Sequence, residues 1–163
     1  MMSHPHGEMR RTDRLVTDEN VINDILSNNH LMHVALSENN IPFLVPLFYA
    51  WKNKALYFHS ASNGTKIKIL KNNPVVCFEV SDYQGIIPNE MACNFEAKHR
   101  TVIGLGKAEF ITDIHEKISA LDDIVARFTE QKFEYPSAQI AHTNIVKISI
   151  ESMKCKQHGF DEE

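Results

Sequence analysis

Residues 31–60, which read LMHVALSENNIPFLVPLFYAWKNKALYFHS, decide the fold. Three strand-like segments follow one another closely in this stretch, at 31–37, 41–51 and 55–60. The turn-forming groups Glu38-Asn39-Asn40 and Lys52-Asn53-Lys54 separate them. Because connections this short join neighbouring antiparallel strands, the stretch predicts a β-meander.

The middle segment of the meander carries two prolines, Pro42 and Pro46. Proline has no backbone N–H group to donate to a neighbouring strand. We therefore expect this strand at a sheet edge or at bulges. Its backbone groups would then be free for a ligand.

Outside the meander, the sequence indicates a few helices and three further strands. The expected helices are 18–28 after an N-cap at Thr17, 65–71, and one that begins at Asp113. The expected strands are 75–80, 94–111 and 146–151, with 83–93 as a long loop and 130–142 irregular. Gly104 and Gly106 indicate bulges or close approaches. About six antiparallel strands with peripheral helices predict a small, mainly β barrel.

The composition is that of one globular domain, with 163 residues, 43% hydrophobic and 23% charged. We expect a disordered extension at 1–8, one domain at 9–156 and a tail at 157–163. The three cysteines are odd in number and lack CxxC spacing, so neither a disulfide framework nor a zinc ribbon is predicted. No apolar run matches a membrane span and the first residues lack a signal-peptide pattern, which favours a cytoplasmic location.

Charge and motifs exclude several function classes. The net charge of −4 argues against a nucleic-acid surface, which usually shows a clustered basic excess. The sequence contains no GxGxxG, Walker A, HExxH or GxSxG motif, and its histidines lack the spacing of a metal site. Two loose basic groups are solvated faces or small-anion sites: Arg10, Arg11 and Arg14, and Lys66, Lys68 and Lys71.

Residues 57–66, YFHSASNGTK, contain the parts of an anion site. A predicted strand with polar side chains leads into a loop that contains glycine, and the helix that follows carries Lys66 in its first turn. Backbone N–H groups, the hydroxyls of Ser60 and Thr65, and the Lys66 charge can converge there on a terminal phosphate. Polar loops before helices also serve simply as caps, so composition leaves both roles open.

Six short motifs follow one another along residues 9–156. They are MRRTDR at 9–14, VPLFY at 45–49, LYFHSA at 56–61, GTK at 64–66, NPVVCF at 73–78 and RTVIGLG at 100–106. In order and spacing they resemble the Nim-like (nitroimidazole-resistance) branch of the pyridoxamine 5'-phosphate oxidase-related proteins. That resemblance implies an FMN-binding split β-barrel.

The resemblance also implies a homodimer with FMN at its interface. Three groups of residues would form the site: Leu47, Phe48 and Tyr49 at the flavin ring, largely through backbone; His59, Ser60 and Lys66 at the phosphate; and Arg100, Thr101 and Val102 on a strand that serves the shared site, from the other subunit. Thr101 keeps the hydroxyl of the usual serine, whereas His99 replaces a common aromatic residue. The simpler role for the side chains of Leu47, Phe48, Val102 and Ile103 is barrel core.

The implied function is that of a flavin-dependent oxidoreductase. A reduced pyridine nucleotide, NAD(P)H, would give hydride to FMN, which would pass electrons to a small nitroaromatic or nitroimidazole acceptor. No catalytic residue is assigned. The alternatives are a flavin- or haem-binding protein that stores or senses its ligand without turnover, and a dimeric interaction module with a vestigial pocket. Deazaflavin-binding proteins share the same fold group.

Overall fold

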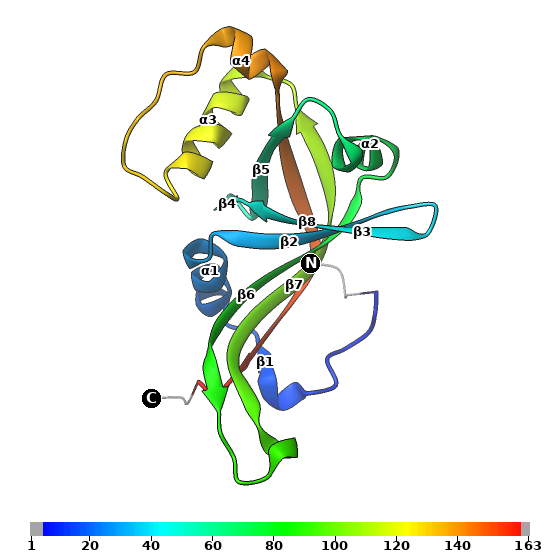
Figure 1. The fold of residues 1–163 in the computed structure, drawn as a ribbon, viewed down its shortest axis with the longest axis vertical. Helices are drawn as coiled ribbons and strands as arrows, with labels where there is room; N and C mark the ends of the chain where they lie inside the picture. The colour runs from blue at the N-terminus through cyan, green and yellow to red at the C-terminus, as the bar shows by residue number, and fades with distance from the viewer. Residues whose placement is uncertain (1–4, 161–163) are drawn as a thin grey trace.

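The computed structural model describes residues 5–160 as one curled sheet with helices around it (Figure 1). The strands are β1 (Leu15–Val16), β2 (Leu31–Glu38), β3 (Ile41–Phe48), β4 (Ala50–Lys52), β5 (Ala55–Ala61), β6 (Val75–Ile87), β7 (Glu96–Ile111) and β8 (Thr143–His158). The helices are α1 (Glu19–Asn28), α2 (Thr65–Asn72), α3 (Ile114–Val125) and α4 (Ser137–His142), with short 3-10 turns η1 (Thr12–Arg14) and η2 (Ala92–Asn94). Residues 1–4 of the expected extension and 161–163 of the expected tail lie outside the described part.

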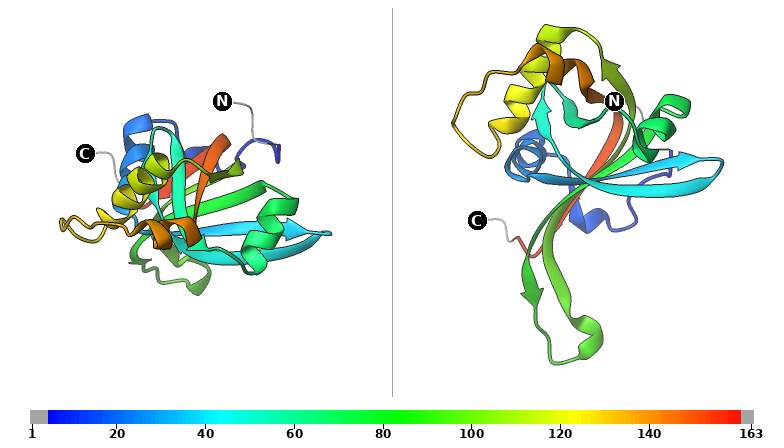
Figure 2. Two further views of the ribbon diagram at one scale, coloured as in Figure 1. Left: turned by 90° about the horizontal axis from the view of Figure 1, so that it is seen from above. Right: turned by 45° about the horizontal axis from the view of Figure 1, so that its top comes forward.

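The sheet is antiparallel, in the order β3-β2-β6-β7-β8-β5-β4, with β1 paired to β8. Its edge strands, β3 and β4, follow each other in the chain and are joined by Tyr49 alone. A flat sheet would hold its two edges far apart, so a one-residue link requires the sheet to curl until the edges meet (Figure 2). The edges do not pair with each other, so the barrel stays split along this seam. The predicted split barrel is confirmed, with eight strands where about six were expected.

The inner face of the curled sheet forms the core. Along β2, Met32, Val34 and Leu36 are buried and alternate with side chains that point outward. Phe58 and Phe78 face them from other strands and are almost completely buried. Burying a side chain of this size contributes roughly 1.5–3 kcal/mol. A second, smaller cluster lies under α3 and consists of Ala120, Leu121, Ile140 and Ile145.

The proline-bearing strand lies at a sheet edge, as predicted. β3 pairs with β2 on one side, where Pro42 lies opposite Ser37 and Pro46 opposite His33, and with no other strand among the described residues. The expectation of one strand over 41–51 is wrong, because Tyr49 carries the chain from one edge of the sheet to the other and divides it into β3 and β4.

Both predicted close approaches in β7 are confirmed. A Cβ atom on Gly104 would lie 2.5 Å from the Phe78 ring and 2.7 Å from the backbone oxygen of Ser152. A Cβ on Gly106 would lie 2.6 Å from the backbone oxygen of Ser149. The pairing of β7 with β8 also changes register between Leu105 and Gly106, which is the predicted bulge.

The expected loop at 83–93 is wrong over its first half. β6 continues to Ile87 and pairs with β7 as far as Glu96, so the connection shrinks to residues 88–95. The two strands form an arm that extends beyond the barrel (Figure 1). A register change between Tyr83 and Ile86, with Gly85 at φ 118°, interrupts the alternating pattern and hides the strand from sequence analysis.

β8 is also much longer than the expected 146–151. Ile150 pairs with Gly106 and Ser152 with Leu105, so Glu151 is the extra residue of the bulge. An extra residue breaks the period-two alternation of inward and outward side chains. The pattern that predicts the first half of β8 therefore does not extend to its second half.

The helix caps confirm one prediction and correct another. Asp113 accepts hydrogen bonds from the backbone N–H groups of His115 and Glu116, as expected for the start of α3. The N-cap of α1 is Asp18 and not Thr17, because the Asp18 carboxylate accepts from the N–H of Asn20 at 2.8 Å. Within residues 5–160, no helix is long and apolar enough to cross a membrane.

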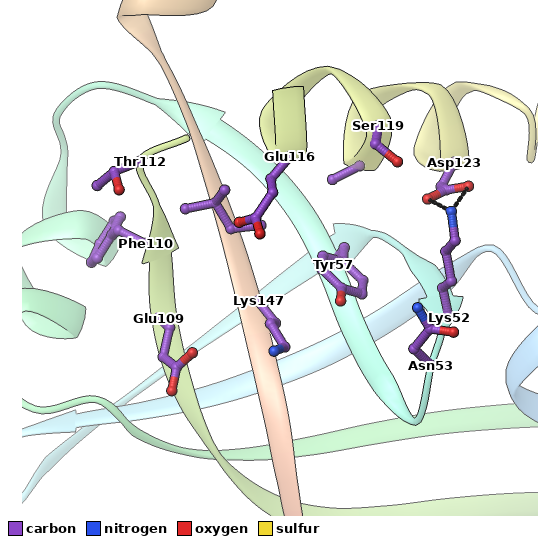
Figure 3. Close-up of a pocket in the computed structure, with 12 residues that line it drawn as sticks. Lys52, Asn53, Tyr57, Glu109, Phe110, Thr112, Glu116, Ser119, Asp123 and Lys147 are labelled. Atoms are coloured by element: carbon purple, nitrogen blue, oxygen red, sulfur yellow. Dashed lines mark hydrogen bonds and ion pairs between the residues drawn. The ribbon is translucent and has the colours of Figure 1, made fainter. Parts of the chain in front are cut away.

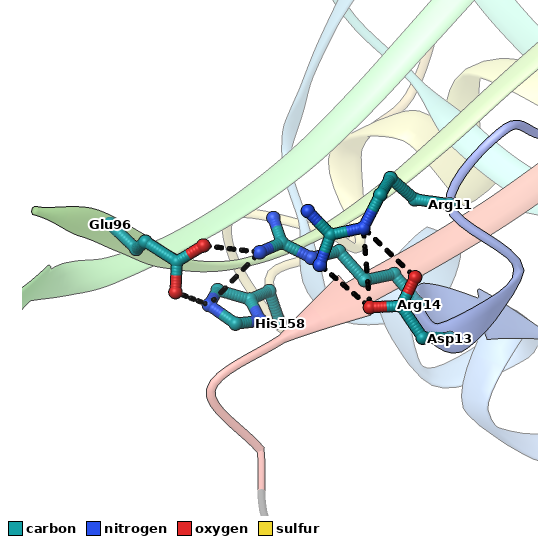
Figure 4. Close-up of polar contacts among 5 residues, drawn as sticks. All are labelled: Arg11, Asp13, Arg14, Glu96 and His158. Atoms are coloured by element: carbon teal, nitrogen blue, oxygen red, sulfur yellow. Dashed lines mark hydrogen bonds and ion pairs between the residues drawn. The ribbon is translucent and has the colours of Figure 1, made fainter. Parts of the chain in front are cut away.

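The amino-terminal basic residues are paired with acids (Figure 4). Arg11 bonds Asp13 at 2.6 Å, and this hydrogen bond lowers the pKa of the Asp13 carboxyl to about 2. Arg14 bonds Glu96, the first residue of β7, and His158 at the end of β8 bonds the same carboxylate at 2.6 Å. Two of the three basic residues, Arg11 and Arg14, thus already have acidic partners, and the Arg14 pair joins this segment to β7.

Candidate functional site

The end of β5 and the start of α2 bring together the residues predicted to hold a phosphate. β5 carries His59 and Ser60, and the chain turns into α2 at Gly64, whose φ of 117° favours glycine. No side chain caps α2 at Gly64. The first N–H groups of a helix have no partner within the helix, so those of α2 are available to an anion.

Two basic side chains lie at this helix start without a neutralising acid. Lys66 is half-buried, with its Nζ 5.3 Å from the centre of the Phe58 ring, and burial lowers its pKa. The pKa of His59 is also lowered. The larger cause is partial desolvation of the ring, although the residue as a whole is exposed, and the smaller cause is the charge of Lys66. Neither side chain forms an ion pair within residues 5–160. With its pKa below the ordinary value, His59 is mainly neutral at neutral pH, so Lys66 supplies the positive charge and His59 a hydrogen-bond donor for a bound anion.

Lys68, two positions further along α2, is in a different environment. Its Nζ lies 3.7 Å from the Glu38 carboxylate, and its side chain is exposed. The loose basic group predicted at the middle of the chain therefore does not act as a unit. Lys66 and Lys68 point in different directions from α2: Lys68 lies beside Glu38, whereas the charge of Lys66 lowers the pKa of His59.

The residues predicted at the flavin ring occupy the seam between β3 and β4. Tyr49 is fully buried and donates a hydrogen bond from its hydroxyl to the carbonyl of Leu26 at 2.8 Å; burial raises its pKa. Leu47 packs against the core. Phe48, in contrast, keeps 54% of its surface exposed. A ligand at the seam can therefore touch the Phe48 side chain, whereas Tyr49 is fully buried within the protomer.

The third predicted group lies elsewhere in the protomer. Arg100 is ion-paired to Asp24 and Asp82, both at 2.8 Å, and Val102 is fully buried. Thr101 is also buried, and its hydroxyl lies 3.0 Å from that of Ser81.

The pairing of β8 measures how far this group lies from the phosphate residues. In β8, Asn144 pairs with Ser60 of β5, and Gln157 pairs with Arg100 of β7. At about 3.3 Å per residue, the two points are roughly 40 Å apart along the strand. One protomer thus brings His59, Ser60 and Lys66 together, but leaves Arg100 and its neighbours remote from them.

Comparison with known proteins places this geometry in a family. The family model for pyridoxamine 5'-phosphate oxidase matches residues 18–157, from the start of α1 to the end of β8. The chain belongs to the pyridoxamine 5'-phosphate oxidase family. The comparison with curated proteins found no match.

Solved structures agree with this family assignment. A candidate 5-nitroimidazole antibiotic resistance protein from Bacteroides thetaiotaomicron is 27% identical, with a TM-score of 0.77 over 87% of this chain and 85% of that one. The flavocytochrome Anf3 from Azotobacter vinelandii is 28% identical, with a TM-score of 0.84 over 96% and 76%. An FAD- and haem-binding protein from Mycobacterium smegmatis, at 18% identity, shares the fold, with a TM-score of 0.83 over 92% and 77%.

A cavity of about 350 Å³ lies outside the predicted site of this family domain (Figure 3). It opens between α3 and the outer faces of β5, β7 and β8, where Tyr57 and Lys147 line it. Lys52 bonds the Asp123 carboxylate at its edge, at 2.6 Å. None of the nine predicted site residues lines it. Sequence analysis missed this cavity because its residues come from distant segments and form no motif.

Proposed function

We propose that this chain binds FMN and acts as an oxidoreductase that reduces a small nitroaromatic or nitroimidazole acceptor. The observation that carries the proposal is the uncapped start of α2, with His59 and Lys66 beside it and no acidic partner for Lys66 within residues 5–160. A terminal phosphate supplies the missing negative charge and accepts hydrogen bonds from the helix N–H groups. The similarity to the flavocytochrome supports a flavin as the bearer of that phosphate, and the similarity to the nitroimidazole resistance protein supports the acceptor.

The residues of this chain would bind and orient the flavin. Lys66, His59 and Ser60 hold the phosphate, and the backbone at Leu47 and Phe48 orients the ring. The buried Tyr49 hydroxyl ties the seam to α1 by its hydrogen bond to the Leu26 carbonyl. FMN, when bound, supplies two-electron redox chemistry between NAD(P)H and the acceptor.

We also propose that the site is completed by a second copy of the chain. Arg100, Thr101 and Val102 lie far from Lys66 within one protomer, which supports a site shared with a partner subunit. The edge strand β3 exposes Ile41 and Leu44, which a partner would cover.

Light scattering at micromolar concentration is expected to give the mass of two chains. An isologous dimer is the commonest way to bury such an edge. The monomer mass alone would contradict the shared site.

Turnover distinguishes the oxidoreductase from a flavin-binding protein that only stores or senses its ligand. Under anaerobic conditions, NADH or NADPH is expected to bleach the bound flavin, and 2-methyl-5-nitroimidazole is expected to restore its colour. Flavin that stays oxidised with both donors, or a Soret band in the purified protein, would favour the storage or sensing role. The similarity to a flavocytochrome is the observation that favours this storage or sensing role as the second candidate function.

A further inference from the structure

Three aromatic rings gather at the end of β3. The Phe48 and Phe128 rings lie 5.0 Å apart at an interplanar angle of 75°, an edge-to-face contact. The His30 ring lies 5.4 Å from Phe128 and is tilted by 47°. Although they touch, Phe48 and Phe128 remain 54% and 52% exposed. Neighbouring apolar rings that stay exposed form a surface suited to a ligand or a partner.

The segment that carries Phe128 is fixed, although it follows the end of α3. The guanidinium of Arg127 donates hydrogen bonds to the carbonyl of Ser27, in the last turn of α1, and to that of Asn29, in the turn between α1 and β2. Figure 1 shows the carboxyl end of α3 directed toward this turn. The Phe128 ring is therefore held next to β3 before any ligand arrives, which lowers the entropic cost of binding.

His30 adds a polar group to the two apolar rings. Its Nε2 lies 2.9 Å from the carbonyl oxygen of Arg127. Because a carbonyl only accepts, Nε2 carries the proton of that bond. Nδ1 has no hydrogen-bond partner within residues 5–160, and in the neutral imidazole it is an acceptor. A ligand N–H or hydroxyl can donate to it.

We propose that Phe128, together with Phe48 and His30, forms a subsite for a planar aromatic electron acceptor beside the flavin ring. The inference rests on the proposed function, because it is the FMN ring at Leu47 and Phe48 that makes the neighbouring rings a substrate site. An aromatic acceptor stacks on the open faces in an offset or edge-to-face arrangement. Its polar substituent reaches His30, and the reducible group is directed toward β3.

The test measures binding of 2-methyl-5-nitroimidazole to the FMN-loaded oxidised dimer by ligand-observed NMR, which does not depend on the flavin signal. Phe128→Ala is expected to weaken its affinity by about tenfold, the size of a lost aromatic contact with its buried area. Phe128→Leu, which keeps the bulk but not the ring, is expected to weaken it by a smaller factor. Phe128→Tyr is expected to bind as the parent does.

Phe133 provides the matched control. It lies on the same segment after α3, is 45% exposed, and has no ring contact in the described part of the chain. Phe133→Ala is expected to leave the affinity unchanged. FMN affinity, followed by flavin fluorescence, should be the same in all variants. Equal affinity of Phe128→Ala and the parent for the nitroimidazole would overturn the subsite. Failure of the parent to bind FMN would overturn the proposed function, and the same NMR comparison on that protein would still decide whether the rings bind an aromatic ligand.

Discussion

Replacing Lys66 with alanine is expected to weaken FMN binding by about one to two orders of magnitude. Lys66 stands at the uncapped start of α2 without an acidic partner in residues 5–160, and a phosphate is the natural counter-charge. Charge-assisted hydrogen bonds of this kind contribute roughly 1.5–3 kcal/mol. Titration of the apo-protein with FMN, followed by flavin fluorescence, gives the two dissociation constants.

Lys68→Ala is the control, because it removes the same charge from the same helix. Lys68 is exposed and faces Glu38, so its loss should change FMN affinity much less. Circular dichroism confirms that each variant is folded. If both variants and the parent bound FMN equally, the phosphate would have to lie elsewhere, and the strongest residue-level support for a flavin site would be gone.

Gly104→Ala is expected to destabilise the protein by about 1–3 kcal/mol. The new Cβ would lie 2.5 Å from the Phe78 ring and 2.7 Å from the Ser152 backbone oxygen, well inside normal contact distance. Phe78 is completely buried and cannot move aside without disturbing its neighbours. Urea unfolding of the two proteins measures the change in midpoint.

Ile103→Ala tests whether any substitution at this point of β7 has the same effect. Ile103 is 38% exposed, so its truncation should cost less than Gly104→Ala. Combining Gly104→Ala with Phe78→Leu should recover part of the loss, because the ring contact is relieved while the Ser152 contact stays. Unchanged stability of Gly104→Ala would mean that β7 and β8 are not packed this closely.

The sequence predicted most elements whose pattern is local. The meander of β2 to β5, the edge position of β3 and the Asp113 cap of α3 all depend on neighbouring residues, and all are present. Elements interrupted by bulges were missed or shortened. Gly85 in the arm and Glu151 in β8 each displace the alternation by one residue, and no local pattern shows where the partner strand continues.

The candidate site was predicted in the same uneven way. His59, Ser60 and Lys66 lie within one short segment, and a strand, a glycine and a helix suffice to bring them together. Sequence analysis did not single out Phe128, which lies just beyond the end of α3 at Val125. Its contact with Phe48 arises because Arg127 ties this segment to the α1–β2 turn, which lies about a hundred residues earlier in the chain. Only the folded chain shows such a contact.

The absorption spectrum of the purified protein, recorded after incubation with FMN and removal of unbound ligand, tests the central claim most directly. The two basic groups at the start of α2 predict that the flavin stays with the protein and gives its near-ultraviolet and blue absorption bands. A protein that emerges colourless would contradict the claim, as would one that shows a Soret band and no flavin.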